Sequence, residues 1–187
     1  WSRYHRYTEE EYKEIQPEGN YIVLNNLNFT NKNSTGEYRF SPNIEFEGNI
    51  NYNGYIITID TVTKDNLYSL SPLFYNIGAN AKISNLYIEL YMNTKYPING
   101  KLIFDSNKGT IENCFINLKE SNGKKNVDFA LVGSYNKGTI NNLIVKLSED
   151  LYAEYNGNII YENHGTIKNG YLYGKSLKLS AREEAFT

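Results

Sequence analysis

The sequence predicts an all-β protein, a single-stranded right-handed parallel β-helix with one coil for about every 27–29 residues. Three observations indicate this solenoid: a segment that repeats at that period, alternating apolar and polar residues within each repeat, and Asn-x-Gly corners between repeats. The alternation is the period-two pattern of a strand with one buried face, whereas helical repeats show a period of about 3.6 residues. Propeller blades, at about 40 residues or more, are too long for this period.

The repeat itself consists of an apolar run, a corner and a segment of the type Gly-Thr-Ile-x-Asn. The anchor isoleucines of four repeats are spaced by 28, 29 and 27 residues: Ile83, Ile111, Ile140 and Ile167. In the last three repeats the corner is an Asn-x-Gly tripeptide that starts at Asn107, Asn136 or Asn163. We expect a tight turn there because glycine adopts positive φ freely and asparagine tolerates it. A degenerate earlier copy at 53–59 places the start of the repeat before residue 60.

The chain divides into a cap, a solenoid and a short polar end. Residues 1–20 predict a helical cap, in which Thr8 is the N-cap and Glu11 occupies the capping-box position. Such a helix would cover the open edge of the first coil. We expect the β-helix over 21–179, and a linker or the start of a further element over 180–187. The whole is interpreted as a segment of a larger protein.

One asparagine recurs at the same place in every coil. The four residues are Asn85, Asn113, Asn142 and Asn169. Stacked about 4.8 Å apart, their side-chain amides can hydrogen-bond in a row. We interpret them as a structural ladder at a coil corner, and a polar binding column is the alternative.

Composition and motifs predict no catalytic residue, no cofactor and no metal ligand. The net charge of −2 and the lack of a basic stripe argue against a nucleic-acid partner. No apolar run approaches the roughly 20 residues that span a bilayer, so we expect no membrane insertion. The only cysteine, Cys114, occupies an inward position and is interpreted as core. His164 replaces a corner lysine of earlier repeats, which indicates a solvent-facing turn.

A glycan-cleaving enzyme would need two carboxylates that face one cleft. The aspartates Asp60, Asp65, Asp105 and Asp128 are scattered through the repeats, and none recurs beside a second acid in a neighbouring coil. This argues against a polysaccharide lyase or hydrolase, a class that many parallel β-helices represent.

A column of apolar residues is predicted on the outer side of the repeated strands. Its members are Tyr87, Phe115, Ile144 and Tyr171. Exposed apolar strips often mark interfaces, but stacked aromatic side chains also stabilise a sheet by themselves, and both interpretations stay open. The segments 93–101, 119–128 and 148–158 leave the helix at one point of the repeat and are expected to be loops that form a second candidate surface.

The region from Glu18 to Leu90 resembles a non-catalytic region of Gram-positive immunoglobulin A-specific zinc metallopeptidases and the GLUG-type repeats of bacterial surface proteins. The residues that carry the resemblance are Gly19, Tyr21, Phe46, Gly48, Asn53, Gly54, Leu73, Phe74, Ile83, Asn85 and Leu86. The zinc ligands of that family have no counterpart here. The resemblance implies a non-catalytic module of a secreted or wall-attached extracellular protein.

Together with the absence of catalytic motifs, the resemblance implies a module that positions substrate or acts as a scaffold in an immunoglobulin A-cleaving zinc metallopeptidase. Its expected partners are a host protein, such as immunoglobulin A, or neighbouring domains of the same chain. An adhesin segment that binds a host protein or glycan is the second hypothesis, and a carbohydrate-active enzyme is the third.

Overall fold

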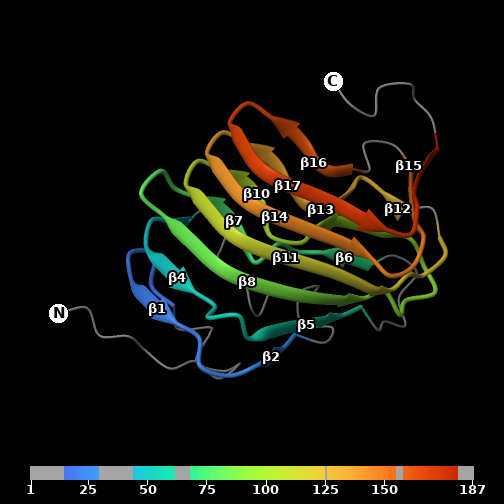
Figure 1. Ribbon diagram of the computed structural model, residues 1–187, viewed down its shortest axis with the longest axis horizontal. Coiled ribbons are helices and arrows are strands. Elements are labelled where there is room, and N and C mark those ends of the chain that lie inside the picture. The colour runs from blue at the N-terminus through green and yellow to red at the C-terminus, as the bar shows by residue number, and fades with distance from the viewer. Residues whose placement is uncertain (1–14, 30–43, 62–67, 125, 155–157, 181–187) are drawn as a thin grey trace.

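The protein is a parallel β-solenoid in the computed structural model, which describes residues 15–29, 44–61, 68–124, 126–154 and 158–180. Within these residues every element is a strand, and all the strand pairs are parallel. Figure 1 shows the coils stacked from the blue N-terminal strands to the red C-terminal ones. The predicted fold class is therefore confirmed.

Three sheets form the sides of the solenoid. Sheet A has the order β1-β4-β8-β11-β14-β17, with β5 beside β8 and β2 beside β5. Its strands are β1 (Asn20–Ile22), β2 (Leu27–Asn28), β4 (Asn49–Asn51), β5 (Ile56–Asp60), β8 (Lys82–Tyr91), β11 (Thr110–Glu120), β14 (Thr139–Leu147) and β17 (Thr166–Gly174).

Sheet B lies behind sheet A in Figure 1 and has the order β3-β7-β10-β13-β9-β6, with β16 paired to β13. Its strands are β3 (Glu45–Phe46), β6 (Tyr68–Leu70), β7 (Phe74–Ile77), β9 (Ile98–Lys101), β10 (Phe104–Asn107), β13 (Phe129–Asn136) and β16 (Asn158–Asn163). Sheet C is shorter, and its strands are β12 (Asn126–Val127), β15 (Leu151–Glu154) and β18 (Leu177–Ser180).

The register between coils confirms the repeat that the sequence predicts. The four anchor isoleucines are direct partners across β8, β11, β14 and β17. The coil before them is longer, because Asn49 pairs with Lys82, 33 residues on. Residues 1–14 of the predicted helical cap lie outside the described residues, and 15–20 contain a turn at Pro17 and the first residue of β1.

The interior is a continuous apolar column, as the alternation of the strands predicts. In β8 the inward Ile83, Leu86, Ile88 and Leu90 are at most 1% exposed. The column is covered at its first coil, where Tyr21 is buried, but it is open at β17, the last strand of sheet A in the described part of the chain. The inward side chains of that strand, Ile167 and Leu172, are 38% and 48% exposed.

The recurring asparagines form a ladder on the outer surface. Each Nδ2 donates to the Oδ1 of the preceding coil, from Asn142 to Asn113 (2.9 Å), Asn113 to Asn85 (3.1 Å) and Asn85 to Asn51 (2.9 Å). Asn169 departs from the row and donates to Asn141 instead (3.2 Å). Asn51 precedes the degenerate copy at 53–59 and pairs in register with Ser84, so the repeat period does not predict its place in the ladder.

Positive φ belongs to this ladder and not to the Asn-x-Gly corners, contrary to the sequence-based expectation. The backbone φ of Asn85, Asn113, Asn142 and Asn169 lies between 53° and 60°. At the corners glycine is needed for close approach: a Cβ on Gly138 would lie 2.1 Å from the carbonyl oxygen of Gly109 in the coil below. Stacked corners therefore bring backbone against backbone.

The corner asparagines have a different role, because they form a second ladder that is buried. The Nδ2 of Asn107 donates to the Oδ1 of Asn136 (2.8 Å), and that of Asn136 donates to Asn163 (2.7 Å). The side chains of Asn107 and Asn136 are fully buried. The Oδ1 of Asn107 also accepts the backbone N–H of Gly109 (3.1 Å), so the amide closes the corner and links the coils.

The segments expected to be loops are partly strands. β9, β12 and β15 lie within 93–101, 119–128 and 148–158, and they add to sheets B and C. Asn126 holds this side together, since its Oδ1 accepts the N–H of Ile98 (2.9 Å) and its Nδ2 donates to the carbonyl of Tyr152 (3.0 Å). β12 and β15 therefore belong to the third wall of the solenoid, sheet C, and β9 extends sheet B.

The two ladders differ in burial, and this difference predicts different costs of mutation. Asn136→Ala leaves buried polar partners in the neighbouring coils unpaired, at about 1–3 kcal/mol for each such group. We expect it to lower the free energy of unfolding by about 2–3 kcal/mol. Asn142→Gly keeps the left-handed backbone and leaves amides that water can reach, so we expect about 1 kcal/mol or less.

Urea denaturation of both variants tests this order. Asn142→Ala serves as the control for backbone strain, because alanine in the left-handed region costs about 1–2 kcal/mol more. Equal losses in Asn136→Ala and Asn142→Gly would contradict the assignment of a buried and an exposed ladder.

Candidate functional site

The outer face of sheet A carries the apolar column that the sequence predicts. The structure brings all four members together as register partners: Tyr87, Phe115, Ile144 and Tyr171. The rings of Tyr87 and Phe115 stack with centroids 4.8 Å apart and an angle of 23° between their planes. Ile56 of β5 is the partner of Tyr87 and extends the column by one coil. We call these five residues the outer stripe.

The outer stripe is most exposed at β17, the last strand of sheet A in the described part of the chain. Tyr87, Phe115 and Ile144 are half-buried, whereas Tyr171 is 60% exposed. Tyr173, two residues along β17, is also exposed (49%). Stacking accounts for the burial of Tyr87 and Phe115, but it does not cover Tyr171. The accessible apolar area of this face is therefore concentrated at β17.

Polar groups of β8 lie beside Tyr87 in the outer stripe. The hydroxyls of Tyr87 and Tyr91 both donate to Glu89, at 3.3 Å and 3.0 Å. Partial burial raises the pKa of both tyrosines, and the Glu89 carboxylate raises it further. For Tyr87 a hydrogen bond with Asn117 opposes the rise in pKa. These hydroxyls consequently stay protonated at neutral pH and act as donors.

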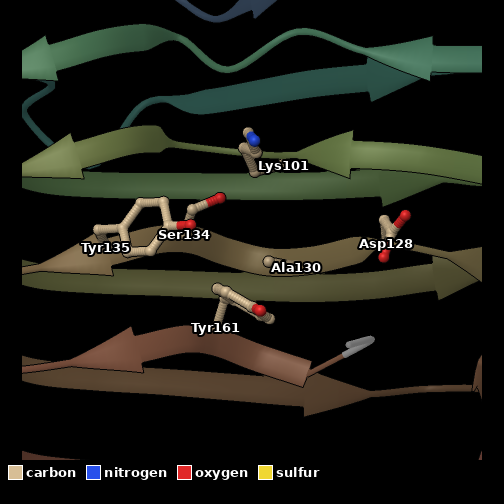
Figure 2. A pocket seen from close by; sticks show the side chains of 6 residues that line it. All are labelled: Lys101, Asp128, Ala130, Ser134, Tyr135 and Tyr161. Carbon is tan, nitrogen blue, oxygen red and sulfur yellow. The ribbon is translucent and has the colours of Figure 1, made fainter. Parts of the chain in front are cut away.

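Sheet B has a shallow cleft on its outer side, which the sequence analysis missed. The volume of the cleft is about 180 Å³. Figure 2 shows the residues that line it, which are Lys101, Asp128, Ala130, Ser134, Tyr135 and Tyr161. The rings of Tyr135 and Tyr161 meet edge to face, with centroids 5.7 Å apart. The Nζ of Lys101 forms a salt bridge of 2.7 Å with Asp105. The cleft thus combines two aromatic rings with an ammonium group and carboxylates.

The aspartates that the sequence leaves scattered are in part brought together by this cleft. Asp128 lines it directly, and Asp105 adjoins it through Lys101. The sequence gives no sign of this arrangement, because the two aspartates occupy unrelated positions of the repeat. Lys101 and Asp128 lie at the ends of two of the segments that were expected to form a loop surface.

His164, which the sequence places in a solvent-facing turn, is an exposed corner residue whose Nε2 contacts Glu162. The described residues contain no group of three or more histidine, cysteine, aspartate or glutamate side chains that could hold a metal ion. They also contain no helix with the length and apolar character needed to cross a bilayer.

Cys114 lies in the core and not at a site. It is 1% exposed and pairs in register with Leu86 and Leu143. Burial raises the pKa of its thiol from 9.0 to about 12. The nucleophilic thiolate is therefore suppressed at neutral pH.

Comparison with known proteins gives no relative: the chain matches no protein-family model, no curated protein and no solved structure. The resemblance to the immunoglobulin A metallopeptidase region and to GLUG-type repeats stays a prediction. The function is therefore inferred from the chemistry of the two surfaces, the outer stripe and the cleft.

The thiol of Cys114 predicts a specific loss of stability in alkali. Above pH 9 the unfolded chain releases the thiol proton, whereas the folded chain keeps it until about pH 12, so stability falls as the pH rises through this window. Cys114→Val removes this titration at similar volume. Between pH 8 and pH 10 we expect the parent to lose about 1.4 kcal/mol more than the variant.

Urea titrations of both proteins at the two pH values measure the difference. Ionisation of the tyrosines affects both proteins alike and cancels in the comparison. Equal losses in the parent and in Cys114→Val would contradict a buried neutral thiol.

Proposed function

We propose that this chain is a non-catalytic module that binds a protein partner through the outer stripe of sheet A. In this proposal it positions substrate or acts as a scaffold in a secreted or wall-attached protein. The sequence resemblance suggests an immunoglobulin A-cleaving zinc metallopeptidase as the parent. The observation that carries the proposal is the continuous apolar column of Ile56, Tyr87, Phe115, Ile144 and Tyr171, which ends on the exposed Tyr171.

The outer stripe has the physical properties of a protein-binding surface. Exposed apolar strips with polar edges mark interfaces, and tyrosine offers a large rigid contact area with a hydrogen-bonding group at its end. The Glu89 carboxylate, which accepts the hydroxyls of Tyr87 and Tyr91, supplies such a polar edge. The stripe lies on strands that are paired on both sides as far as β14, so little ordering is needed on binding.

An adhesin segment that binds a host protein or a glycan is the alternative, and for a protein partner the same surface supports it. The two proposals differ in the identity of the partner and not in the residues used. A third hypothesis, a carbohydrate-active enzyme, needs carboxylates in catalytic roles. Asp105 is engaged by Lys101 at 2.7 Å, which favours a charge-pairing role for it.

Binding of the chain to immobilised human immunoglobulin A tests the leading proposal. We expect binding by the parent and a loss of at least about tenfold in a Tyr87→Ser/Phe115→Ser/Tyr171→Ser variant, since buried aromatic contacts dominate interfaces. Tyr171→Ser alone is the informative single variant, because its side chain is 60% exposed and its loss leaves the folded state nearly unchanged.

Ile44→Ser is the matched control, because Ile44 is an exposed apolar residue (37%) outside the outer stripe. Thermal unfolding of each variant separates lost binding from lost structure. If the parent does not bind immunoglobulin A, the proposed substrate is wrong. If it binds and the folded triple variant binds equally well, the outer stripe is not the surface used.

A further inference from the structure

We propose that the cleft on sheet B binds a neutral sugar ring, the terminal pyranose of a glycan. This cleft lies on a different sheet from the outer stripe and does not depend on its function. Its volume of about 180 Å³ is below the roughly 300–1,000 Å³ of pockets for drug-sized ligands. It therefore suits one ring and not an extended chain.

The cleft exists because one coil departs from the pattern of its neighbours. Ala130 of β13 pairs with Lys101 of β9, and its small side chain leaves a low floor between larger ones, as Figure 2 shows. The register of β13 against β16 then shifts between Ala130 and Gly133, which is a β-bulge. Bulges re-aim side chains and are common beside binding sites.

Asp128 forms the wall opposite the two tyrosines in Figure 2. Its φ of 50° makes it the one residue other than asparagine and glycine with positive φ in the described part of the chain. It is exposed, and its own carbonyl accepts the N–H of Gly100 (3.2 Å), which ties it to the neighbouring coil. The backbone of Asp128 is thus fixed at the edge of the cleft.

The charges at the cleft select against ionic ligands. The Lys101 ammonium disfavours a cation, although two tyrosine rings alone would suit one. The carboxylates of Asp105 and Asp128 disfavour an anion, so an ion of either sign meets a like charge here. A neutral ligand that offers both hydroxyl donors and hydroxyl acceptors fits this arrangement.

A sugar ring meets both the polar and the aromatic groups. Its hydroxyls can donate to the Asp128 carboxylate and accept from the Lys101 ammonium, which has donors only. Its C–H face, which is weakly positive, can lie on the negative face of an aromatic ring. Tyr135 and Tyr161 supply such faces, since they are 39% and 41% exposed despite their mutual contact.

The test uses the whole chain and simple sugars. Saturation-transfer NMR would be recorded with the methyl glycosides of galactose, glucose and N-acetylglucosamine, and with N-acetylneuraminic acid as the anionic probe. We expect at least one neutral glycoside to bind with a dissociation constant on the order of 1 mM, as befits a shallow site. N-acetylneuraminic acid should bind more weakly.

Two variants assign the binding to the cleft. Tyr161→Ala removes a stacking face, and Asp128→Asn removes the charge while it keeps a residue that tolerates positive φ. We expect each to weaken binding at least about tenfold, equivalent to about 1.4 kcal/mol. Tyr173→Ala is the matched control, because it removes an equally exposed tyrosine (49%) from the other sheet.

Three results would overturn the proposal. These are no saturation transfer to any neutral glycoside, unchanged binding in both Tyr161→Ala and Asp128→Asn, and preferential binding of the anionic probe. Because the proposed protein interface uses sheet A, immunoglobulin A binding by Tyr161→Ala reports on that interface separately. Failure of one proposal therefore leaves the other measurable.

Discussion

In-register hydrogen bonding between successive coils is the interaction on which this structure depends. A strand of sheet A has its backbone partners in the coil before and the coil after, and a single coil has none of its own. Equivalent residues therefore lie about one strand spacing apart, roughly 4.8 Å, and must suit each other as neighbours. Every recurrent feature results from this rule, including the isoleucine column inside, the asparagine ladder outside and the buried amides at the corners.

The same rule determines the surfaces. An outward position that is apolar in successive coils becomes a continuous stripe, as with Tyr87, Phe115 and Ile144. A cleft arises in the opposite way, where one coil departs from its neighbours, as β13 does with a small Ala130 and a bulge. Regularity in this fold thus makes continuous stripes on the surface, and irregularity makes hollows.

The sequence predicts what the repeat preserves and misses what it does not. The fold class, the isoleucine register and the outer ladder can be inferred from residues that are identical at one period. Ile56 was missed because the first copy is degenerate, although it occupies the expected place. Asn51 was missed because it pairs in register with Ser84, one place before the ladder asparagine Asn85. The Asn-x-Gly corner was visible, but the pattern has two physical explanations. Close approach at Gly138 and burial of Asn136 apply here, and positive φ does not.

The cleft has no such signal, since its residues come from different positions of different coils. Lys101 and Tyr161 belong to no repeated pattern in the sequence, and only the stacking of β9, β13 and β16 brings them to one place. This is also why alternation identifies the core, whereas the cleft can be found only in the three-dimensional structure. Residues of different types that lie far apart in the sequence produce no periodic pattern when they come together in the fold.

The constant register makes the length of the molecule a discrete quantity. Loss or duplication of one whole coil would shift everything beyond it by a single strand spacing and preserve every column, with one rung fewer or more. A change of one or two residues inside β11 or β14 would instead shift the register at Asn113 or Asn142, whereas the segments between the strands accommodate coils of 28 and of 29 residues. The length of such a solenoid therefore varies by whole coils. The length of the outer stripe would change in steps of about 4.8 Å, and the column of apolar side chains would continue at each step.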